Sequence, residues 1–520
     1  MRRRMRGAAR VFLILLVVVA LGAGLQYARD LKARREIVVL VSPIEGSGTQ
    51  SIEITERLAG VLAEPRTERG RVVIRRLRSA VTKEQGSSRA RALGQRQRAA
   101  LVVWGYLEPE GADARLTVVV EKLAPPTSLH FSVGEHAVEG VLAEPDTLVL
   151  TGRLADDDDL GSPVRLATAA LHYRLGAYAE AVRLLDALAD GEQAVGGRAL
   201  LLMRGNAALL AGRPERAVRD YTALLQSDPQ PAEVHGNLGL AYAALGDHTA
   251  AAAEFEAALA YDHEDETLYL NRGVSQALRG EHEKAIADYD RALRLNPWAA
   301  RAYLNRGVSR AALGDHERAI EDFSRALQIA LTASAHLNRG LSRAALDHHR
   351  QAIGDFSRAL RLHPADSLAL VGRGRSRSAL GDQAGAVADH TAALEVDPHL
   401  AIAYYERGIA YMVLGRHHQA LEDFSAAIRI NPADAAAYKG RGVSRILRRE
   451  YPQALDDLSR AIQLAPRDAE AFFHRGIAYR LQGTPLKAIP DMEKVLELSR
   501  DATLRQQAEE QVQQIRSEGP

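Results

Sequence analysis

One interval constrains the fold more than any other feature: short glycine-containing stretches recur every 34 residues from residue 198 to about 502. The dodecamers YLNRGVSQALRG (269–280) and YLNRGVSRAALG (303–314) show this most clearly. Successive units carry the glycine in the same place, with a single interval of 33, at Gly205, Gly239, Gly273, Gly307, Gly340, Gly374, Gly408, Gly442 and Gly476. Such a period indicates a solenoid, because one supersecondary unit cannot cover its own apolar face and must stack on its neighbours.

Other positions keep the same phase. Alanine follows each glycine by twelve residues, from Ala217 to Ala488, and proline closes most units. In six repeats an aromatic residue stands four residues after this alanine, at Tyr221, Phe255, Tyr289, Phe323, Phe356 and Phe424. Small residues let two antiparallel helices approach closely, an aromatic ring fills the remaining gap, and proline stops the second helix. Each unit is therefore predicted to be a helix hairpin, and the pattern resembles the tetratricopeptide repeat.

The resemblance implies a superhelical solenoid whose first helices line a concave surface. We expect about ten repeats over residues 162–502, the first of them degenerate, and a polar capping helix with a tail over 503–520. The predicted fold class is mainly α: a tetratricopeptide solenoid preceded by a small α/β domain and an N-terminal membrane helix. The resemblance is specific for the fold and says little about the function.

Arginine and aspartate are paired by position within the repeats. The arginine before the phased glycine is matched by an aspartate sixteen residues later, in Arg272–Asp288, Arg306–Asp322, Arg339–Asp355, Arg373–Asp389, Arg407–Asp423 and Arg441–Asp457, and also in Arg204–Asp220 and Arg475–Asp491. Where Leu238 replaces the arginine, Glu254 stands at the acid position. We predict a structural salt bridge from the first to the second helix of each hairpin. Pairing with the preceding repeat fits less well, because Arg204 would then face Leu184. Partly buried pairs of this kind fix the register of packing.

Four asparagines precede the arginine or leucine by one residue, at Asn237, Asn271, Asn305 and Asn338. One residue turns an α-helix by about 100°, so these side chains are expected on the concave side. An amide both donates and accepts, and a ladder of amides can hold an extended peptide backbone, as the resemblance to peptide-binding tetratricopeptide proteins also implies. The alternative is that asparagine is the repeat's default residue at this place.

The asparagine series does not continue through the C-terminal repeats. The same place holds Gly372, Glu406, Gly440 and His474, so that half of the groove must bind something else, or nothing. A clamp for chaperone carboxylates, which the family also provides, needs basic side chains beside the asparagine. The preceding residue is mostly apolar here, with Lys439 as the exception, which disfavours such a clamp.

The N-terminus is predicted to direct the chain to a membrane. Residues 1–10 form a basic tail, and residues 11–28 are an apolar run that reaches about 27 Å as a helix, enough to cross a thin hydrocarbon core. We favour an uncleaved anchor over a cleaved signal, because the nearest small-x-small site would cut into the apolar run. The arginines of the tail predict a cytoplasmic N-terminus with the bulk of the chain outside, as a periplasmic or cell-surface protein.

Between the anchor and the repeats the pattern changes to strands, at residues 36–42, 71–77, 100–107 and 114–123, with helix-like stretches at 51–63 and about 83–98. This predicts a small α/β domain over 36–125, followed by a linker over 126–161. IVVLVSPIEGSGTQSIEITERLAGVLAE followed by ALGQRQRAALVVWGYL resembles the N-terminal domain of TolB-type envelope proteins.

Catalytic and metal-binding chemistry is not predicted. The chain has no cysteine, and no nucleophile, base and oxyanion-stabilising set can be assembled. The GSGT loop (46–49) lacks the lysine and spacing of a phosphate-binding loop, and the acids of ADDDDL (155–160) are consecutive rather than alternate. Histidines recur at the hairpin turns, but successive repeats are too far apart for two of them to share a metal. We therefore expect no cofactor and no enzyme.

These patterns together favour a membrane-anchored scaffold that binds protein or peptide segments in the solenoid groove. Net charge is +1 and does not imply nucleic-acid binding. The alternative is a sensory or regulatory subunit whose α/β domain binds a small anionic ligand and whose repeats relay that state to partners.

Overall fold

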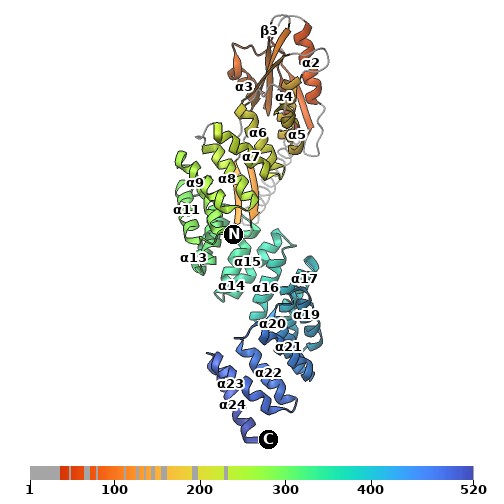
Figure 1. The fold of residues 1–520 in the computed structure, drawn as a ribbon, viewed down its shortest axis with the longest axis vertical. Coiled ribbons are helices and arrows are strands. Elements are labelled where there is room, and N and C mark those ends of the chain that lie inside the picture. Colours follow the sequence, from red (N-terminus) through yellow and green to blue (C-terminus); the bar gives the residue numbers. More distant parts are fainter. Residues whose placement is uncertain are drawn as a thin grey trace, which may run out of the picture. The chain divides into compact units, whose positions relative to one another are not determined.

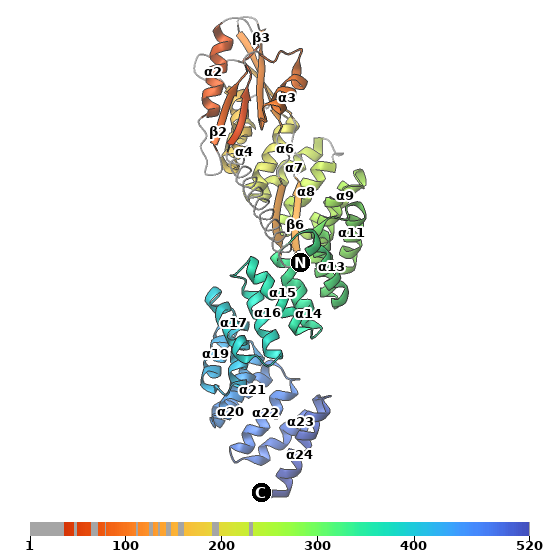
Figure 2. The same cartoon turned by 180° about the vertical axis from the view of Figure 1, so that it is seen from behind.

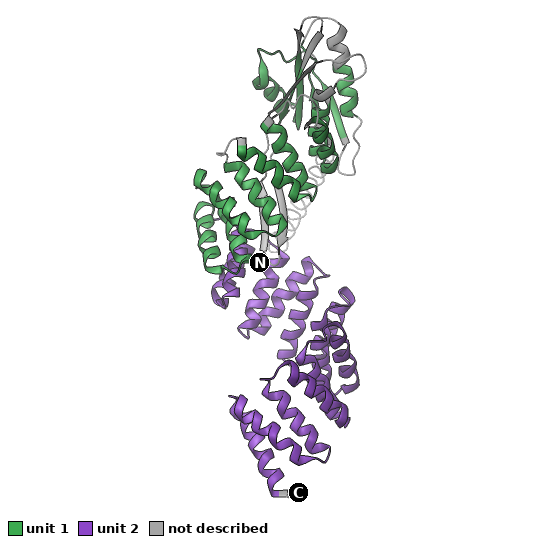
Figure 3. Ribbon diagram, in the orientation of Figure 1, with its two compact units in different colours: residues 1–296 green, residues 297–520 purple. Residues whose placement is uncertain are grey.

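The computed structural model describes residues 36–45, 49–63, 71–77, 80–110, 113–123, 128–133, 136–141, 147–153, 161–189, 197–227 and 232–518 (Figure 1). The chain divides into two compact units, Met1–Asn296 and Pro297–Pro520 (Figure 3).

A five-stranded mixed sheet opens the first unit. Its strands are β1 (Glu36–Val41), β2 (Arg71–Arg76), β3 (Leu101–Glu110), β4 (Asp113–Lys122) and β7 (Thr147–Arg153), in the order β2-β1-β3-β4-β7. Strand β1 pairs in parallel with β2 and β3, whereas β4 is antiparallel to both β3 and β7. Helices α2 (Thr49–Ala63) and α3 (Gly86–Arg96) connect the parallel strands. The four strands and two helices expected from the sequence are confirmed.

The sheet is held by a short run of buried aliphatic side chains. Val39, Leu40 and Val41 on β1 are all buried, as expected of a central strand that is covered on both faces. Trp104 on β3 packs near Val102 in the same core, and its indole donates to the buried carboxylate of Glu121. Such burial of consecutive residues explains why the strand sequence is apolar without alternation.

The predicted linker is wrong, because residues 126–161 contain three strands and the start of a helix. Strands β5 (Ser128–Val133) and β6 (His136–Val141) pair as an antiparallel hairpin, and β7 extends the sheet beside β4. Helix α4 (Gly161–Arg174) then contacts β4, β7 and α2. The α/β region and the first helix of the repeats therefore pack together within the first unit.

Helix hairpins follow one another in both units. In the first unit they are α4 with α5 (Tyr178–Ala189), α6 (Gly197–Leu210) with α7 (Pro214–Ser227), α8 (Ala232–Leu245) with α9 (His248–Tyr261), and α10 (Glu266–Leu278) with α11 (His282–Leu295). In the second unit they are α12 (Ala300–Ala312) with α13 (His316–Ile329), α14 (Ala333–Ala345) with α15 (His349–Leu362), α16 (Ser367–Ala379) with α17 (Gln383–Val396), α18 (Ala401–Val413) with α19 (His417–Ile430), α20 (Ala435–Leu447) with α21 (Tyr451–Leu464), and α22 (Ala469–Leu481) with α23 (Ala488–Leu498). The helical and α/β parts of the predicted fold class are confirmed: a helical solenoid follows a small α/β region.

The phased glycine is explained by the aromatic ring of the same repeat. A Cβ atom on Gly273 would lie 2.7 Å from the ring of Tyr289, and one on Gly307 would lie 2.6 Å from that of Phe323. Both distances are shorter than any normal contact, so only glycine lets the two helices close on the ring. The six predicted aromatic side chains are all fully buried.

The solenoid ends in helix α24 (Ala502–Glu518), which packs on α23. Ala508 and Val512 of α24 join Met492 and Val495 of α23 in one core cluster. Within the second unit, the first helices of successive hairpins also contact each other directly, from α12 through α14, α16, α18 and α20 to α22.

Several predicted features lie outside the described residues: the basic tail (1–10), the anchor (11–28), most of the GSGT loop and the acidic run 155–160. Within the described part of the chain, no helix is long and apolar enough to cross a membrane.

Candidate functional site

The arginine–aspartate pairs predicted from the sequence are confirmed, and they share one bidentate geometry. In each, arginine Nε donates to aspartate Oδ2 at 2.8–3.0 Å and Nη2 donates to Oδ1 at 2.5–2.8 Å. The aspartates are buried, at Asp220, Asp288, Asp322, Asp355, Asp389, Asp423, Asp457 and Asp491. Bidentate pairing satisfies both carboxylate oxygens, and removal of the arginine would leave a buried charge.

The same arginines also reach the preceding repeat, a contact that was not predicted from the sequence. In five of them the remaining nitrogen, Nη1, donates to a hydroxyl on the preceding second helix, as in Arg339 to Ser324 (3.0 Å) and Arg407 to Thr391 (3.1 Å). Arg373, Arg441 and Arg475 do the same with Ser357, Ser425 and Ser459. The signal was present in the sequence, because serine or threonine stands two residues after the aspartate in the repeat that precedes each of these five arginines.

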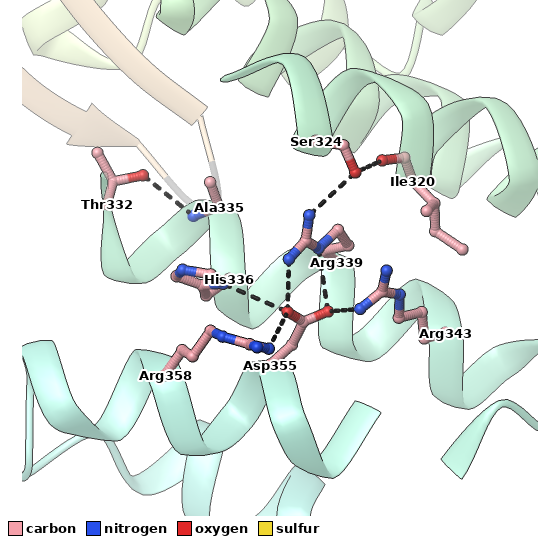
Figure 4. A network of polar contacts seen from close by, with 9 residues as sticks. All are labelled: Ile320, Ser324, Thr332, Ala335, His336, Arg339, Arg343, Asp355 and Arg358. Atoms are coloured by element: carbon pink, nitrogen blue, oxygen red, sulfur yellow. Dashed lines mark hydrogen bonds and ion pairs between the residues drawn. The ribbon is translucent and has the colours of Figure 1, made fainter. Parts of the chain in front are cut away.

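Four aspartates receive a second arginine, four residues after the first. Arg310, Arg343, Arg377 and Arg445 each place Nη1 2.6–2.8 Å from Oδ2 of Asp322, Asp355, Asp389 and Asp457. At Asp355, His336 Nδ1 at 3.3 Å and Arg358 at 3.6 Å complete the ring of partners around a fully buried carboxylate (Figure 4). These partners occupy both carboxylate oxygens of Asp355, so this residue serves to hold the helices together.

Where the arginine is absent, a histidine takes its part. Leu238 replaces the arginine on α8, and His235 Nδ1 lies 2.7 Å from Glu254 Oε2 on α9. The hairpin thus keeps a polar link between its two helices.

The asparagine series is placed differently from the prediction. Asn237, Asn271 and Asn305 are buried, so the expectation that they line an open groove is wrong for these three. At Asn237 the physical reason is visible: its Nδ2 donates to Oδ1 of Asn206 on α6 at 3.0 Å, and that oxygen also accepts from Tyr221. Asn338 is half-buried, and its contact with a peptide backbone stays a prediction.

At two of the places where the series stops, glycine lies against an aromatic ring. A Cβ atom on Gly372 would lie 2.6 Å from the ring of Phe356, and one on Gly440 would lie 2.7 Å from that of Phe424. In these two repeats the first helix therefore packs more closely on the ring of the preceding second helix than a larger residue would allow.

We call the inner face the side of each first helix that is turned away from its own second helix. Each residue turns the helix by about 100°, so this face consists of the residues at four positions relative to the phased glycine. They are the residues six and two positions before the glycine, and one and five positions after it. In the second unit this face carries six exposed apolar side chains, at Leu341, Leu368, Ile402, Val413, Leu447 and Leu481.

Three of these residues form a series with a single spacing. Val413, Leu447 and Leu481 are the last residues of α18, α20 and α22, and 65%, 54% and 46% of their surfaces are exposed. Because these helices contact each other in turn, the three side chains follow one another along the inner face.

Charged side chains lie beside the apolar ones. Glu406, at the asparagine place of α18, accepts from Arg375 Nε at 2.9 Å, and burial raises the pKa of Glu406 against the influence of that arginine. Lys439 on α20 bridges to Asp468 at 2.9 Å and Glu470 at 2.7 Å. The inner face of the second unit therefore combines open apolar positions with two internal ion pairs.

No arrangement suited to a metal ion is found among the described residues, in which no three His, Cys, Asp or Glu side chains cluster. Five of the recurring histidines each begin a second helix, at His248, His282, His316, His349 and His417.

Comparison with solved structures gives matches at modest superposition. YrrB, described as a tetratricopeptide protein with an unusual peptide-binding site, is 28% identical, with a TM-score of 0.32 over 36% of this chain and 96% of that one. The Cut9–Hcn1 assembly of the APC/C is 17% identical, with a TM-score of 0.41 over 61% of this chain and 64% of that one. A tetratricopeptide protein from Parabacteroides merdae is 22% identical, with a TM-score of 0.40 over 48% and 98%.

Family profiles match through most of the helical region. A tetratricopeptide-repeat profile matches residues 202–267, 337–399 and 440–503, a second matches 300–330 and 401–434, and a related repeat profile matches 277–314. No curated protein matches the sequence. The profile matches coincide with the helix hairpins, the phased glycines and the inter-helix salt bridges described above. The chain belongs to the tetratricopeptide-repeat proteins.

Proposed function

We propose that this chain is a membrane-anchored scaffold that binds protein or peptide segments on the inner face of its repeats. The observation that carries the proposal is the open apolar series Val413, Leu447 and Leu481. Contiguous exposed apolar side chains are unfavourable in water and mark surfaces that bind a partner. Apolar anchors supply the affinity at such surfaces, and neighbouring polar groups orient the bound segment.

The two ion pairs beside this series support a role in orientation. Arg375 and Glu406 satisfy each other, as do Lys439 and its two acidic partners, so the face presents little net charge. A partner bound here would therefore use an apolar side of a helix or an alternating apolar strand, rather than a strongly charged tail.

Site-specific photo-crosslinking tests the binding face. A crosslinker at Leu447 is expected to capture a partner, whereas one at the exposed Arg460 on the second helix α21 is not. The substitutions Val413→Glu, Leu447→Glu and Leu481→Glu together should abolish capture without changing the unfolding transition, because all three side chains are already exposed. Equal capture from both crosslinker positions would contradict the proposal.

Anchoring by residues 11–28 forms the second part of the proposal, and it is supported by the length and hydropathy of that run. The full chain should remain in the membrane fraction after an alkaline wash, and a chain that begins at residue 36 should not. A reporter fused after Pro520 should be active outside the cytoplasm, as the arginine-rich tail predicts. A reporter that is active only in the cytoplasm would reverse the orientation.

A further inference from the structure

Two first helices that share the stretch LNRG differ in how much of it is buried. Helix α10 contains LNRGV (270–274) and α14 contains LNRGL (337–341). On α10, Asn271 and Val274 are only 3% and 1% exposed. On α14, Asn338 is half-buried and Leu341 is 41% exposed. Helix α12 carries LNRGV (304–308) as well, and its Asn305 and Val308 are buried like those of α10. Because the residues match, the open face of α14 differs from the closed faces of α10 and α12 in what lies against each helix.

The buried residues of α10 lie on its inner face. Arg272 bonds to Asp288 on α11, and Gly273 faces the ring of Tyr289 on the same helix. Asn271 and Val274 each lie two positions, or about 200°, from one of these residues, and so point away from α11. The second helix of the repeat therefore does not account for their burial.

The β5–β6 hairpin is the element that meets α10 from outside the row of helix hairpins. Strand β6 contacts α10, and the hairpin can be followed beside the first repeats in Figure 2. A two-stranded ribbon that lies against α10 would exclude water from the inner face of this helix. The corresponding face of α14 is open.

The hairpin belongs to an insertion between two adjacent strands. Glu121 at the end of β4 pairs with Thr147 at the start of β7. A tight turn would be enough to join these strands, yet 24 residues, 123–146, separate Lys122 from Thr147. The sheet itself does not require the insertion, which carries the hairpin to α10.

We propose that the β5–β6 hairpin is an internal ligand of the repeats, which keeps the inner face of α10 closed to other chains. A partner that uses this part of the first unit must displace the hairpin, whereas Leu341, Val413 and Leu447 of the second unit are already exposed. The inference refines the proposed function by separating a closed binding face from an open one.

The absence of cysteine makes the closure directly measurable. Asn271→Cys is placed in the otherwise unchanged full chain, and Asn338→Cys serves as the matched open position. Maleimide should label Cys at 271 slowly and at 338 rapidly. Replacing residues 123–146 by an Asn-Gly turn should raise the rate at 271 by at least about tenfold, because labelling no longer waits for the hairpin to open. The rate at 338 should not change.

A second variant guards against disruption of the sheet by the deletion. Val138→Pro removes a ladder hydrogen bond from β6, opposite Phe131, and should raise labelling at position 271 while leaving the insertion in place. If labelling at 271 stays slow in both variants, neighbouring helices bury the residue and the proposal is overturned. It is equally overturned if Asn271→Cys, with the insertion in place, is labelled as rapidly as Asn338→Cys. Neither result depends on a partner, so the proposed scaffold function is tested separately.

Discussion

His390 occupies the place that a buried phenylalanine or tyrosine takes in six other repeats. Its imidazole is fully buried, neither ring nitrogen has a hydrogen-bond partner, and a Cβ atom on Gly374 would lie 2.5 Å from it. Burial lowers the pKa of His390 from 6.5 to about 4. Because the unfolded chain takes up the proton at a higher pH, stability falls as the pH drops from 6.5 toward 4, by up to about 1.4 kcal/mol per pH unit.

Replacing His390 by phenylalanine should therefore reduce the loss of stability in acid. Urea unfolding at pH 7 and pH 5, followed by hydrogen exchange in α16 and α17, measures the effect. The variant is expected to lose less protection than the parent between the two values, since its other titrating groups are the same. Equal losses in both proteins would show that His390 is not the group that titrates.

Arg449 is held in a conformation that suits glycine. The turn between first and second helices places glycine at positive φ in most hairpins, for example Gly280 at 78°, but Arg449 is at 64° and Asp347 at 57°. Left-handed backbone costs a residue with a Cβ atom roughly 1 kcal/mol relative to glycine. Arg449→Gly should raise the free energy of local unfolding of α20–α21, measured by hydrogen exchange, by about that amount, and Gly280→Ala should lower it in α10–α11. A destabilised Arg449→Gly variant would contradict this explanation.

At the scale of helices, the arginines differ in how much depends on them. Arg407 supplies the bidentate pair to Asp423, and no second arginine stands four residues later, where Tyr411 is found. Asp389 is bound by Arg373 and also by Arg377 at 2.8 Å. The two hairpins thus have the same salt bridge, but only Asp389 has a second arginine that would remain if the first were removed.

Arg407→Ala should therefore destabilise its hairpin more than Arg373→Ala does. The first change leaves a buried carboxylate without its arginine and is expected to cost about 3 kcal/mol, whereas Arg377 retains part of the interaction after the second. Local hydrogen exchange in α18–α19 and α16–α17 is the suitable measurement, because repeat arrays do not unfold as one cooperative unit. Equal effects would mean that the second arginine contributes nothing.

At the scale of the molecule, the solenoid needs a cover at its end. Helix α24 buries Ala508 and Val512 against Met492 and Val495 of α23, which would otherwise face water. Deleting residues 502–520 should increase hydrogen exchange in α22 and α23 while leaving α14 and α15 unchanged, because each repeat contacts only its neighbours. Loss of protection throughout the second unit would contradict this nearest-neighbour picture.

The repeat period, the helix hairpins and the salt bridges could be predicted because they depend on residues that are close in the sequence. Gly273 and Tyr289, or Arg407 and Asp423, are sixteen residues apart, and one hairpin brings them together. The same spacing recurs in each repeat, so it can be detected in one sequence alone. The hydroxyl contacts, such as that of Arg407 with Thr391, also join residues at a spacing of fifteen or sixteen and could have been predicted as well.

The exposure of a given place was decided only by the tertiary structure. The sequence LNRG is the same on α10 and α14, yet Asn271 is buried and Asn338 is half open. Likewise, nothing local in residues 126–161 indicates that β7 joins the edge of the sheet or that β6 meets α10. A residue's own sequence sets its place on a helix, but its burial depends on which distant segment packs there, and that is a property of the folded chain.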